Sequence, residues 1–136
     1  MAPLNNKNTA GRQAPAPLLL VDDDPDQLIF LALLLRTEGF EVETCDSAAS
    51  ALELMTSKPF SLVVCDIQMP HITGLEFVRR ARGTTSVPWM PQVPIILFSA
   101  SPAEVGAHAL EAGADMFFEK QQAARLLLSE INSRLK

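Results

Sequence analysis

From position 18 onward, short apolar runs alternate with longer segments in which apolar residues recur at helical spacing. The short runs predict strands at residues 18–22, 41–45, 61–66, 94–98 and 115–119. The longer segments predict helices at residues 25–38, 47–57, 74–82, 102–112 and 122–136. Five such pairs are typical of an α/β domain with a five-stranded, doubly wound parallel sheet and five helices, in which helices cover both faces of the sheet.

Local chemistry supports several of these helix boundaries. Asp24 is an expected N-cap with Pro25 at the first helical position and Gln27 as its capping-box partner. Gly39 is expected to end the same helix as a C′ residue, and Ser47 to cap the next one. Residues 83–94 contain three prolines and Trp89, so they predict a long loop.

Composition places the domain at residues 18–136. Residues 1–17 are rich in Asn, Ala and Pro and lack periodicity, which predicts a disordered N-terminal tail. The remainder is the size of one ordinary globular domain.

Charge and hydropathy exclude two classes of partner. The net charge of −5 gives no basic surface for nucleic acid or anionic lipid. No apolar run approaches the roughly 20 residues needed to span a bilayer, and no signal peptide precedes the domain, so we expect a cytoplasmic protein. Cys45 and Cys65 lie inside apolar runs rather than in metal-binding spacings, which predicts buried, reduced thiols.

Acidic residues end two of the predicted strands. Asp22 and Asp23 close the first strand and Asp66 closes the third, and right-handed winding makes these strands neighbours. Ligands of open parallel sheets bind at this carboxyl edge. Because clustered carboxylates repel one another, a hard divalent cation is expected there, and Mg²⁺ fits best because it needs few protein ligands.

A hydroxyl and an ammonium group are expected at the same edge. Ser99 follows the fourth strand and Lys120 follows the fifth. Together with the carboxylates they form the set that phosphoryl transfer to an aspartate requires: a nucleophile, a metal site and fixed donors for the phosphoryl oxygens. Asp66, at the end of a buried strand, is the expected nucleophile.

Four stretches in register resemble the receiver domains of response regulators. They are Leu19-Leu20-Val21-Asp22-Asp23-Asp24-Pro25, Val63-Val64-Cys65-Asp66-Ile67-Gln68-Met69-Pro70, Ile96-Leu97-Phe98-Ser99-Ala100, and Glu111-Ala112-Gly113-Ala114-Asp115 with Lys120. The resemblance covers residues 18–136 and implies a flavodoxin-like (CheY-like) sheet with strand order 2-1-3-4-5.

The resemblance also implies roles for individual residues. Asp66 would accept the phosphoryl group, and Lys120 would pair with its oxygens. Mg²⁺ would be held by Asp22, Asp23, Asp66 and the backbone carbonyl of Gln68. Ser99 would move to the phosphoryl group while Phe117 turns inward. With these residues the chain would catalyse its own Mg²⁺-dependent phosphorylation and dephosphorylation at Asp66.

The chain departs from the family pattern at two positions. Lys120 is followed by Gln121 where the family usually has a proline with a cis bond; a non-proline cis bond costs about 2.5–4 kcal/mol, so we expect a trans bond and a reshaped loop. Phe117 has no hydroxyl, so any switching at this position has to work through packing.

Two helices suggest contact surfaces. The first helix is apolar around its circumference, and its polar residues Asp26 and Arg36 define a solvent stripe that includes Ile29 and Leu33. In the family a histidine kinase or phosphotransfer protein docks on this helix, and homodimerisation is the second expectation. The alternative to a contact surface is partial cover of this stripe by the tail or by a neighbouring helix. Gly106 weakens the fourth helix, so its face with the fifth strand is expected to move and to report phosphorylation to a downstream protein.

Three alternatives to this function are open. A pseudo-receiver would keep the fold without the chemistry, and the missing proline favours it, while the intact acids oppose it. A receiver detached from a hybrid kinase is a further alternative, because residues 1–17 could be a linker from a larger protein. A metal-dependent phosphatase of similar topology would need an acid where Gln68 stands. His71 and His108 are expected to be solvated surface residues rather than metal ligands or phosphodonors.

Overall fold

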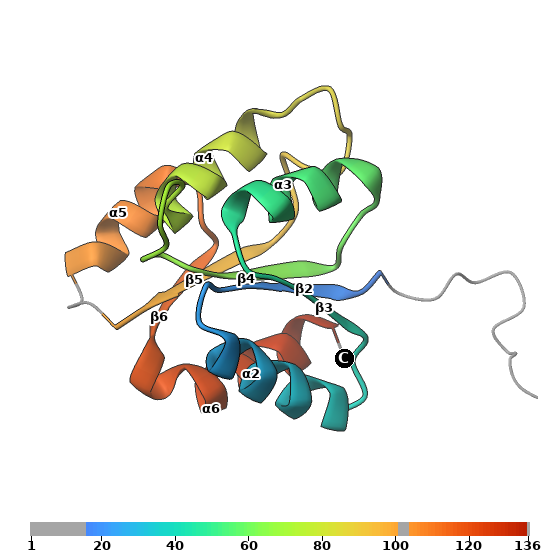
Figure 1. The fold of residues 1–136 in the computed structure, drawn as a ribbon, viewed down its shortest axis with the longest axis vertical. Coiled ribbons are helices and arrows are strands. Elements are labelled where there is room, and N and C mark those ends of the chain that lie inside the picture. The colour runs from blue at the N-terminus through green and yellow to red at the C-terminus, as the bar shows by residue number, and fades with distance from the viewer. Residues whose placement is uncertain (1–15, 101–103, 136) are drawn as a thin grey trace, which may run out of the picture.

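The computed structural model describes residues 16–100 and 104–135, which form a sheet between two layers of helices (Figure 1). The strands are β2 (Leu18–Val21), β3 (Val42–Cys45), β4 (Leu62–Asp66), β5 (Ile95–Ser99) and β6 (Met116–Glu119). The helices are α2 (Pro25–Thr37), α3 (Ala48–Ser57), α4 (Gly74–Gly83), α5 (Glu104–Ala112) and α6 (Lys120–Leu135). All ten elements expected from the sequence are present; residues 1–15, which contain most of the expected tail, lie outside the described residues.

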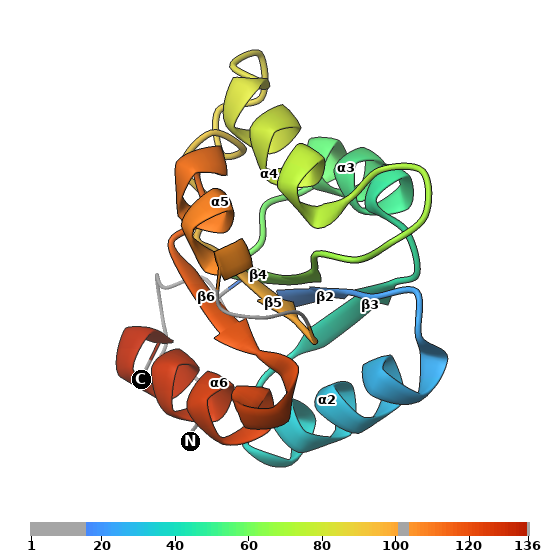
Figure 2. The ribbon, with the colours of Figure 1, turned by 90° about the vertical axis from the view of Figure 1, so that its left-hand side faces the viewer.

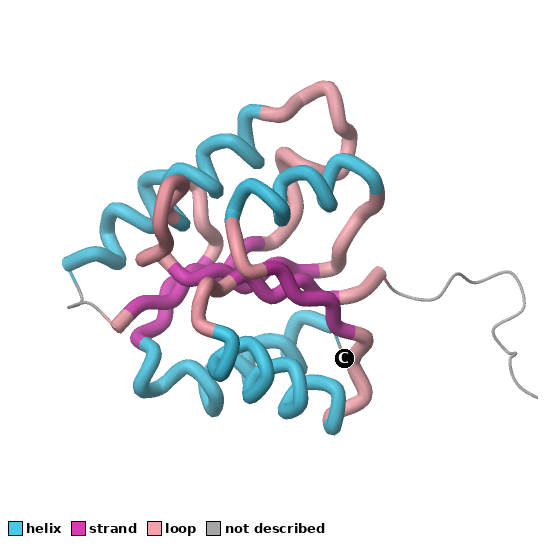
Figure 3. Tube along the Cα trace, viewed as in Figure 1, coloured by secondary structure: helices cyan, strands magenta, loops and turns pink. Residues whose placement is uncertain are grey.

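The five strands are parallel and lie in the order β3-β2-β4-β5-β6. In sequence order this is 2-1-3-4-5, as the family resemblance implied. Helices α3, α4 and α5 cover one face of the sheet, and α2 and α6 cover the other (Figures 1 and 2). The loops gather at the two ends of the strands, with the strands forming the central layer (Figure 3).

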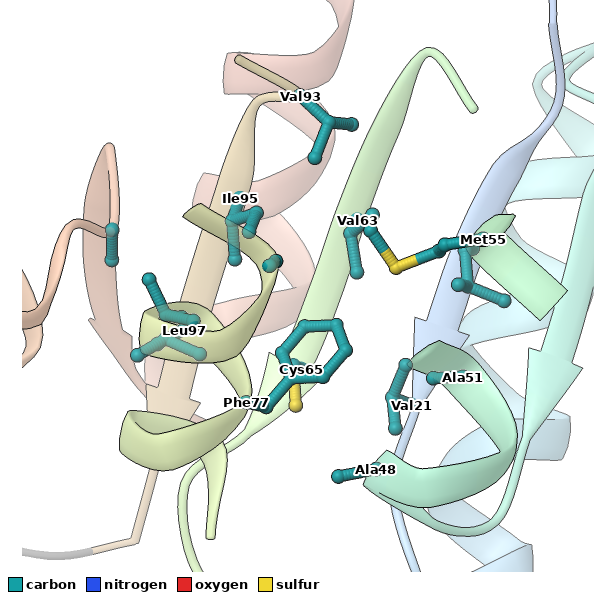
Figure 4. Packing of buried hydrophobic residues seen from close by; sticks show 14 of the residues in the cluster. Val21, Ala48, Ala51, Met55, Val63, Cys65, Phe77, Val93, Ile95 and Leu97 are labelled. Carbon is teal, nitrogen blue, oxygen red and sulfur yellow. The ribbon is translucent and has the colours of Figure 1, made fainter. Parts of the chain in front are cut away.

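Alternate residues along each strand pack into two separate apolar clusters. In β2, Leu19 and Val21 face α3 and α4, while Leu18 and Leu20 face α2 and α6. Figure 4 shows part of the first cluster, where Phe77 of α4 lies over the middle of the sheet. Since β2, β4 and β5 are buried along their whole lengths, a polar residue is accommodated only at their ends.

The caps of α2 agree with the sequence except for one half of the capping box. Asp24 Oδ1 accepts hydrogen bonds from the Asp26 N–H at 3.0 Å and from the Gln27 N–H at 3.5 Å, and Gly39 has a φ of +96° just after the helix. The other half of the box is wrong, because the Asp24 N–H donates to Asp22 Oδ1 at 3.0 Å instead of to the glutamine side chain. The backbone after β2 is therefore used to fix the Asp22 carboxylate.

The junction between β6 and α6 also differs from the expectation. The expected loop is absent: β6 ends at Glu119 and α6 begins at Lys120, two residues before the predicted start. The structure contains no cis peptide bond among the residues that it describes, in agreement with the expected trans bond before Gln121. Since glutamine tolerates helical geometry and supplies an N–H, the helix can begin directly at the strand end.

Arg82 at the end of α4 fixes the long loop before β5. Its guanidinium donates to the carbonyls of Pro91, Val93 and Gly113 and pairs with Asp115 Oδ2 at 2.9 Å. Trp89 in this loop donates to the Met55 carbonyl near the end of α3. This loop lies at the edge of the sheet opposite to the strand ends that carry the acidic residues.

Helix α2 exposes three large apolar side chains among the residues described. Ile29 and Leu33 are 66% and 64% exposed, as the solvent stripe predicted, and Phe30 is 53% exposed, which the stripe did not predict. None of the helices described is both long enough and apolar enough to cross a bilayer. Cys65 is buried, whereas Cys45 is only half-buried, and both thiols are free.

Candidate phosphoryl-transfer site

The strand register brings Asp22 and Asp66 side by side. Val21 of β2 pairs with Cys65 of β4, so the next residue of each chain segment lies at the same level of the sheet. Both carboxylates are almost fully buried, with 1% and 2% of their surface exposed. Asp23, the neighbour of Asp22, is exposed and completes the group at the solvent side.

Lys120 reaches both buried carboxylates. Its Nζ lies 3.3 Å from Asp66 Oδ2 and 3.4 Å from Asp22 Oδ2, and it lies 5.4 Å from the centre of the Phe98 ring. The start of α6 at Lys120 therefore places this ammonium in the site without the family's proline. The expected loop is not needed because the long lysine stem spans the distance from the strand end.

The single Lys120 ammonium does not fully compensate the negative charges of Asp22 and Asp66. Burial, and after it the charge of Asp22, raises the pKa of Asp66 to about 6, against the lowering effect of Lys120. Burial also raises the pKa of Asp22. Burial alone would lower the pKa of Lys120, but attraction to Asp66 and Asp22 outweighs it and the pKa is raised. Lys120 is therefore a cation at neutral pH, and both carboxylates would be stabilised by further positive charge.

The donor atoms fit a hard divalent cation. Carboxylate oxygens of Asp22, Asp23 and Asp66 lie within 4.8 Å of one another. Asp22 Oδ2 is buried, and its neighbour is the Lys120 ammonium, whose Nζ lies 3.4 Å away without a well-formed hydrogen bond. An all-oxygen group of this kind suits Mg²⁺, which binds few protein ligands and keeps several waters. The Gln68 N–H donates to Asp66 Oδ1 at 3.3 Å, so the segment expected to supply the carbonyl ligand lies beside the Asp66 carboxylate.

Ser99 lies at the same edge but makes an unexpected contact. It is fully buried as the last residue of β5, and its hydroxyl donates to Gln68 Oε1 at 2.7 Å. The sequence placed Ser99 at this edge but gave no indication of a bond to the Gln68 side chain. That contact depends on how the loop after β4 folds back over the end of β5.

Phe117 is half-buried and packs against the apolar cluster beneath α3, α4 and α5. An added Cβ at Gly106 of α5 would lie 2.8 Å from its ring. The Phe117 ring therefore packs against Gly106, so this glycine makes room for the ring in addition to weakening α5. His71 and His108 are exposed, as expected, and His71 adopts a φ of +69° in the loop after β4.

Gly74, which opens α4, was not singled out by the sequence. A Cβ at this position would lie 2.4 Å from the Asp66 carbonyl oxygen. The glycine allows the start of α4 to pass directly beneath the backbone of Asp66, and this close approach fixes the end of β4. Only the tertiary contact reveals the requirement.

Comparison with known proteins agrees with the geometry. Residues 18–132 match the family model described as a response regulator receiver domain. The chain is 32% identical over 120 residues to the transcriptional regulatory protein CpxR homolog of Haemophilus influenzae, covering 88% of this chain and 50% of the relative. It is 32% identical over 113 residues to the two-component response regulator ORR11 of Oryza sativa subsp. indica, covering 81% and 74%.

A solved structure shares the fold. The chemotaxis response regulator CheY4 of Vibrio cholerae superposes with a TM-score of 0.79 at 26% identity, covering 90% of this chain and all of that chain. This chain spans only half the length of the Haemophilus relative. The similarity to this relative therefore covers only about half of the relative's own length.

Proposed function

This chain belongs to the response regulator receiver domain family, and on that premise we propose that it is a phosphoacceptor switch of a two-component system or phosphorelay, with Asp66 as the acceptor. The observation that carries the proposal is the meeting of Asp66, Asp22 and Lys120 at one strand edge, with Nζ within 3.4 Å of both carboxylates. A pseudo-receiver would have no need for two buried carboxylates at this cost in free energy.

The chemistry is a transfer between a phosphorylated donor and the Asp66 carboxylate. A carboxylate oxygen forms a bond to phosphorus while the bond from phosphorus to the donor's histidine nitrogen, or to the oxygen of a small acyl phosphate, breaks with its electron pair. The product is an aspartyl phosphate, and hydrolysis by water later restores the carboxylate. With its pKa raised only to about 6, Asp66 is mostly ionised at neutral pH and available as the nucleophile.

Receiver domains generally bind Mg²⁺ at an acidic pocket, and this chain's residues fit that ion. Asp22, Asp23, Asp66 and the Gln68 carbonyl would hold it. When bound, the ion neutralises charge on the phosphoryl oxygens. Lys120 supplies the other fixed positive charge, and its two carboxylate contacts restrict where its ammonium lies.

The proposed signal leaves through Ser99 and Phe117. The Ser99 hydroxyl would donate to a phosphoryl oxygen on Asp66, and Phe117 would repack between β6 and α5. Because Phe117 has no hydroxyl, its part in switching is packing against Gly106. The α5 and β6 face would then present an altered surface to a downstream protein.

A receiver domain implies contact with a histidine kinase or phosphotransfer protein. We place this contact on α2, where Ile29, Phe30 and Leu33 are exposed. Their removal would cost little stability, because exposed side chains contribute little to the core. A homodimer through the same face is the second candidate, distinguished by whether purified protein self-associates.

The test is phosphorylation of the purified chain by acetyl phosphate in the presence of Mg²⁺, followed by intact mass. A gain of one phosphoryl group is expected for the wild type and for Asp46→Asn, which changes an exposed aspartate. No gain is expected for Asp66→Asn or when EDTA removes the metal. Absence of any adduct on the wild type would refute the switch and favour a pseudo-receiver, and continuous phosphate release from unrelated phosphomonoesters would favour a hydrolase.

Mass is the better readout than tryptophan fluorescence. Trp89 is hydrogen-bonded to Met55 at the opposite end of the sheet from Asp66. Its surroundings are therefore distant from the expected change.

A further inference from the structure

The hydrogen bond between Ser99 and Gln68 joins two segments that are far apart in the sequence. Ser99 ends β5 and is fully buried, whereas Gln68 is an exposed residue of the loop after β4. The Ser99 hydroxyl donates to Gln68 Oε1 at 2.7 Å, a good distance for a bond between hydroxyl and carbonyl oxygens. The buried switch hydroxyl is thus held by a side chain at the surface of the site.

A serine hydroxyl has a single proton to donate. In the function proposed above, on which this inference rests, the hydroxyl uses that proton in a hydrogen bond to a phosphoryl oxygen on Asp66. Donation to Gln68 and donation to the phosphoryl group therefore exclude one another. We propose that Gln68 is a positioning residue that holds the Ser99 hydroxyl in the resting state, so that phosphorylation of Asp66 has to break the bond between Gln68 and Ser99.

The backbone of Gln68 is suited to this role. Its N–H donates to Asp66 Oδ1 at 3.3 Å, so the residue is attached to the acceptor through its main chain and to the switch hydroxyl through its side chain. A phosphoryl group on Asp66 alters the hydrogen bond from the Gln68 N–H to Asp66 and competes with Gln68 Oε1 for the Ser99 hydroxyl. The exposed amide can then be hydrated, which keeps the cost of release small.

The expected size of the effect follows from the kind of bond. A neutral hydrogen bond contributes modestly to an equilibrium in water, equivalent to about a two- to tenfold change in affinity. Removing the Gln68 acceptor should therefore make the phosphorylated conformation easier to reach by that factor. A glutamine that itself held the phosphoryl group would give the opposite sign, because its removal would weaken binding.

The test compares Gln68→Met with the wild type for binding of beryllofluoride at a fixed, saturating Mg²⁺ concentration. Methionine keeps the length of the side chain and lacks the amide, and the exposed position should tolerate it. The same two proteins are made in a Ser99→Ala background. Gln92→Met is the control, because Gln92 is an exposed glutamine at the opposite edge of the sheet. The apparent Kd is measured by calorimetry.

We expect Gln68→Met to bind beryllofluoride about two- to tenfold more tightly than the wild type, and Gln92→Met to match the wild type. In the Ser99→Ala background the Gln68 substitution should have a much smaller effect, because the Ser99 donor is already missing. An equal change in both backgrounds, no change, or weaker binding would each overturn the role of Gln68 while leaving Asp66 as the acceptor. Failure of the wild type to bind beryllofluoride would overturn the proposed function, and this inference with it.

A spectroscopic measurement gives an independent outcome. The side-chain amide resonance of Gln68 should shift when beryllofluoride is added to the wild type, because its oxygen loses the Ser99 donor. In Ser99→Ala the resonance should already lie near the shifted position before beryllofluoride is added. A Gln68 resonance that is the same in the wild type and in Ser99→Ala would show that the bond is not formed in solution and would refute the proposal.

Discussion

Replacing Asp66 with asparagine should stabilise the fold at neutral pH when no divalent cation is present. Burial and the charge of Asp22 raise the pKa of Asp66 from its ordinary value of 3.8 to about 6. Between these two values the folded chain binds more protons than the unfolded chain, so the stability contributed by Asp66 falls as the pH rises through this window. The full cost is present above the folded pKa.

The interval between the two pKa values means that Asp66 lowers the free energy of unfolding by about 3 kcal/mol at pH 7.5 and by about 1 kcal/mol at pH 4.5. Asparagine resembles the protonated acid in shape and charge, so Asp66→Asn should recover most of this free energy. The attraction of Lys120 for the ionised carboxylate is already contained in the pKa and does not change the sign.

Urea unfolding in EDTA at pH 7.5 and pH 4.5 measures the effect. Asp66→Asn should raise the free energy of unfolding by about 2–3 kcal/mol at pH 7.5 and by about 1 kcal/mol at pH 4.5. Asp46→Asn, at an exposed position, should change it by less than about 0.5 kcal/mol. Added Mg²⁺ should stabilise the wild type more than Asp66→Asn. Equal gains at both pH values, or destabilisation at pH 7.5, would refute the reasoning.

Three other substitutions test the contacts around the site. Gly74→Ala places a Cβ 2.4 Å from the Asp66 carbonyl oxygen and should cost about 3 kcal/mol or more in urea unfolding, because backbone has to move; a cost below about 1 kcal/mol would contradict this. Arg82→Ala removes hydrogen bonds to Pro91 and Val93 in the loop of residues 84–94 and one to Gly113 before β6. It should cost about 2–3 kcal/mol, with faster amide hydrogen exchange in that loop; unchanged exchange would show that other contacts fix the loop. Gly106→Ala should crowd the Phe117 ring and cost about 1–2 kcal/mol, a loss that Phe117→Leu in the same chain should partly restore if the ring is its cause.

The sequence predicted the main site residues because they occupy strand ends. Asp22, Asp66, Ser99 and Lys120 each follow or end an apolar run, and parallel strands bring such positions to one edge. The exposure of Ile29 and Leu33 was likewise predictable, because helical phase follows directly from sequence spacing. These inferences needed only local periodicity and the handedness of the connections.

Other contacts could not be predicted, because they join residues whose separation depends on packing. The bond between Ser99 and Gln68 requires the loop after β4 to lie over the end of β5. The Gln27 side chain does not complete the capping box because Asp22 accepts the Asp24 N–H instead, which no local motif shows. The start of α6 at Lys120 was missed because apolar spacing predicted a start at residue 122, and Gln121 in place of the family's proline was expected to reshape a loop rather than to extend the helix.

The sequence by itself determined the succession of strands and helices along the chain, the two-sided burial of the sheet and the edge at which the acidic residues meet. Apolar periodicity and the right-handed crossover are sufficient for these features. The tertiary structure alone decided that Lys120 contacts two carboxylates, that the Phe117 ring packs against Gly106 and that Gln68 accepts a hydrogen bond from the Ser99 hydroxyl. Those contacts depend on distances of a few ångströms between separate elements, which close packing of the core sets and residue spacing along the chain does not.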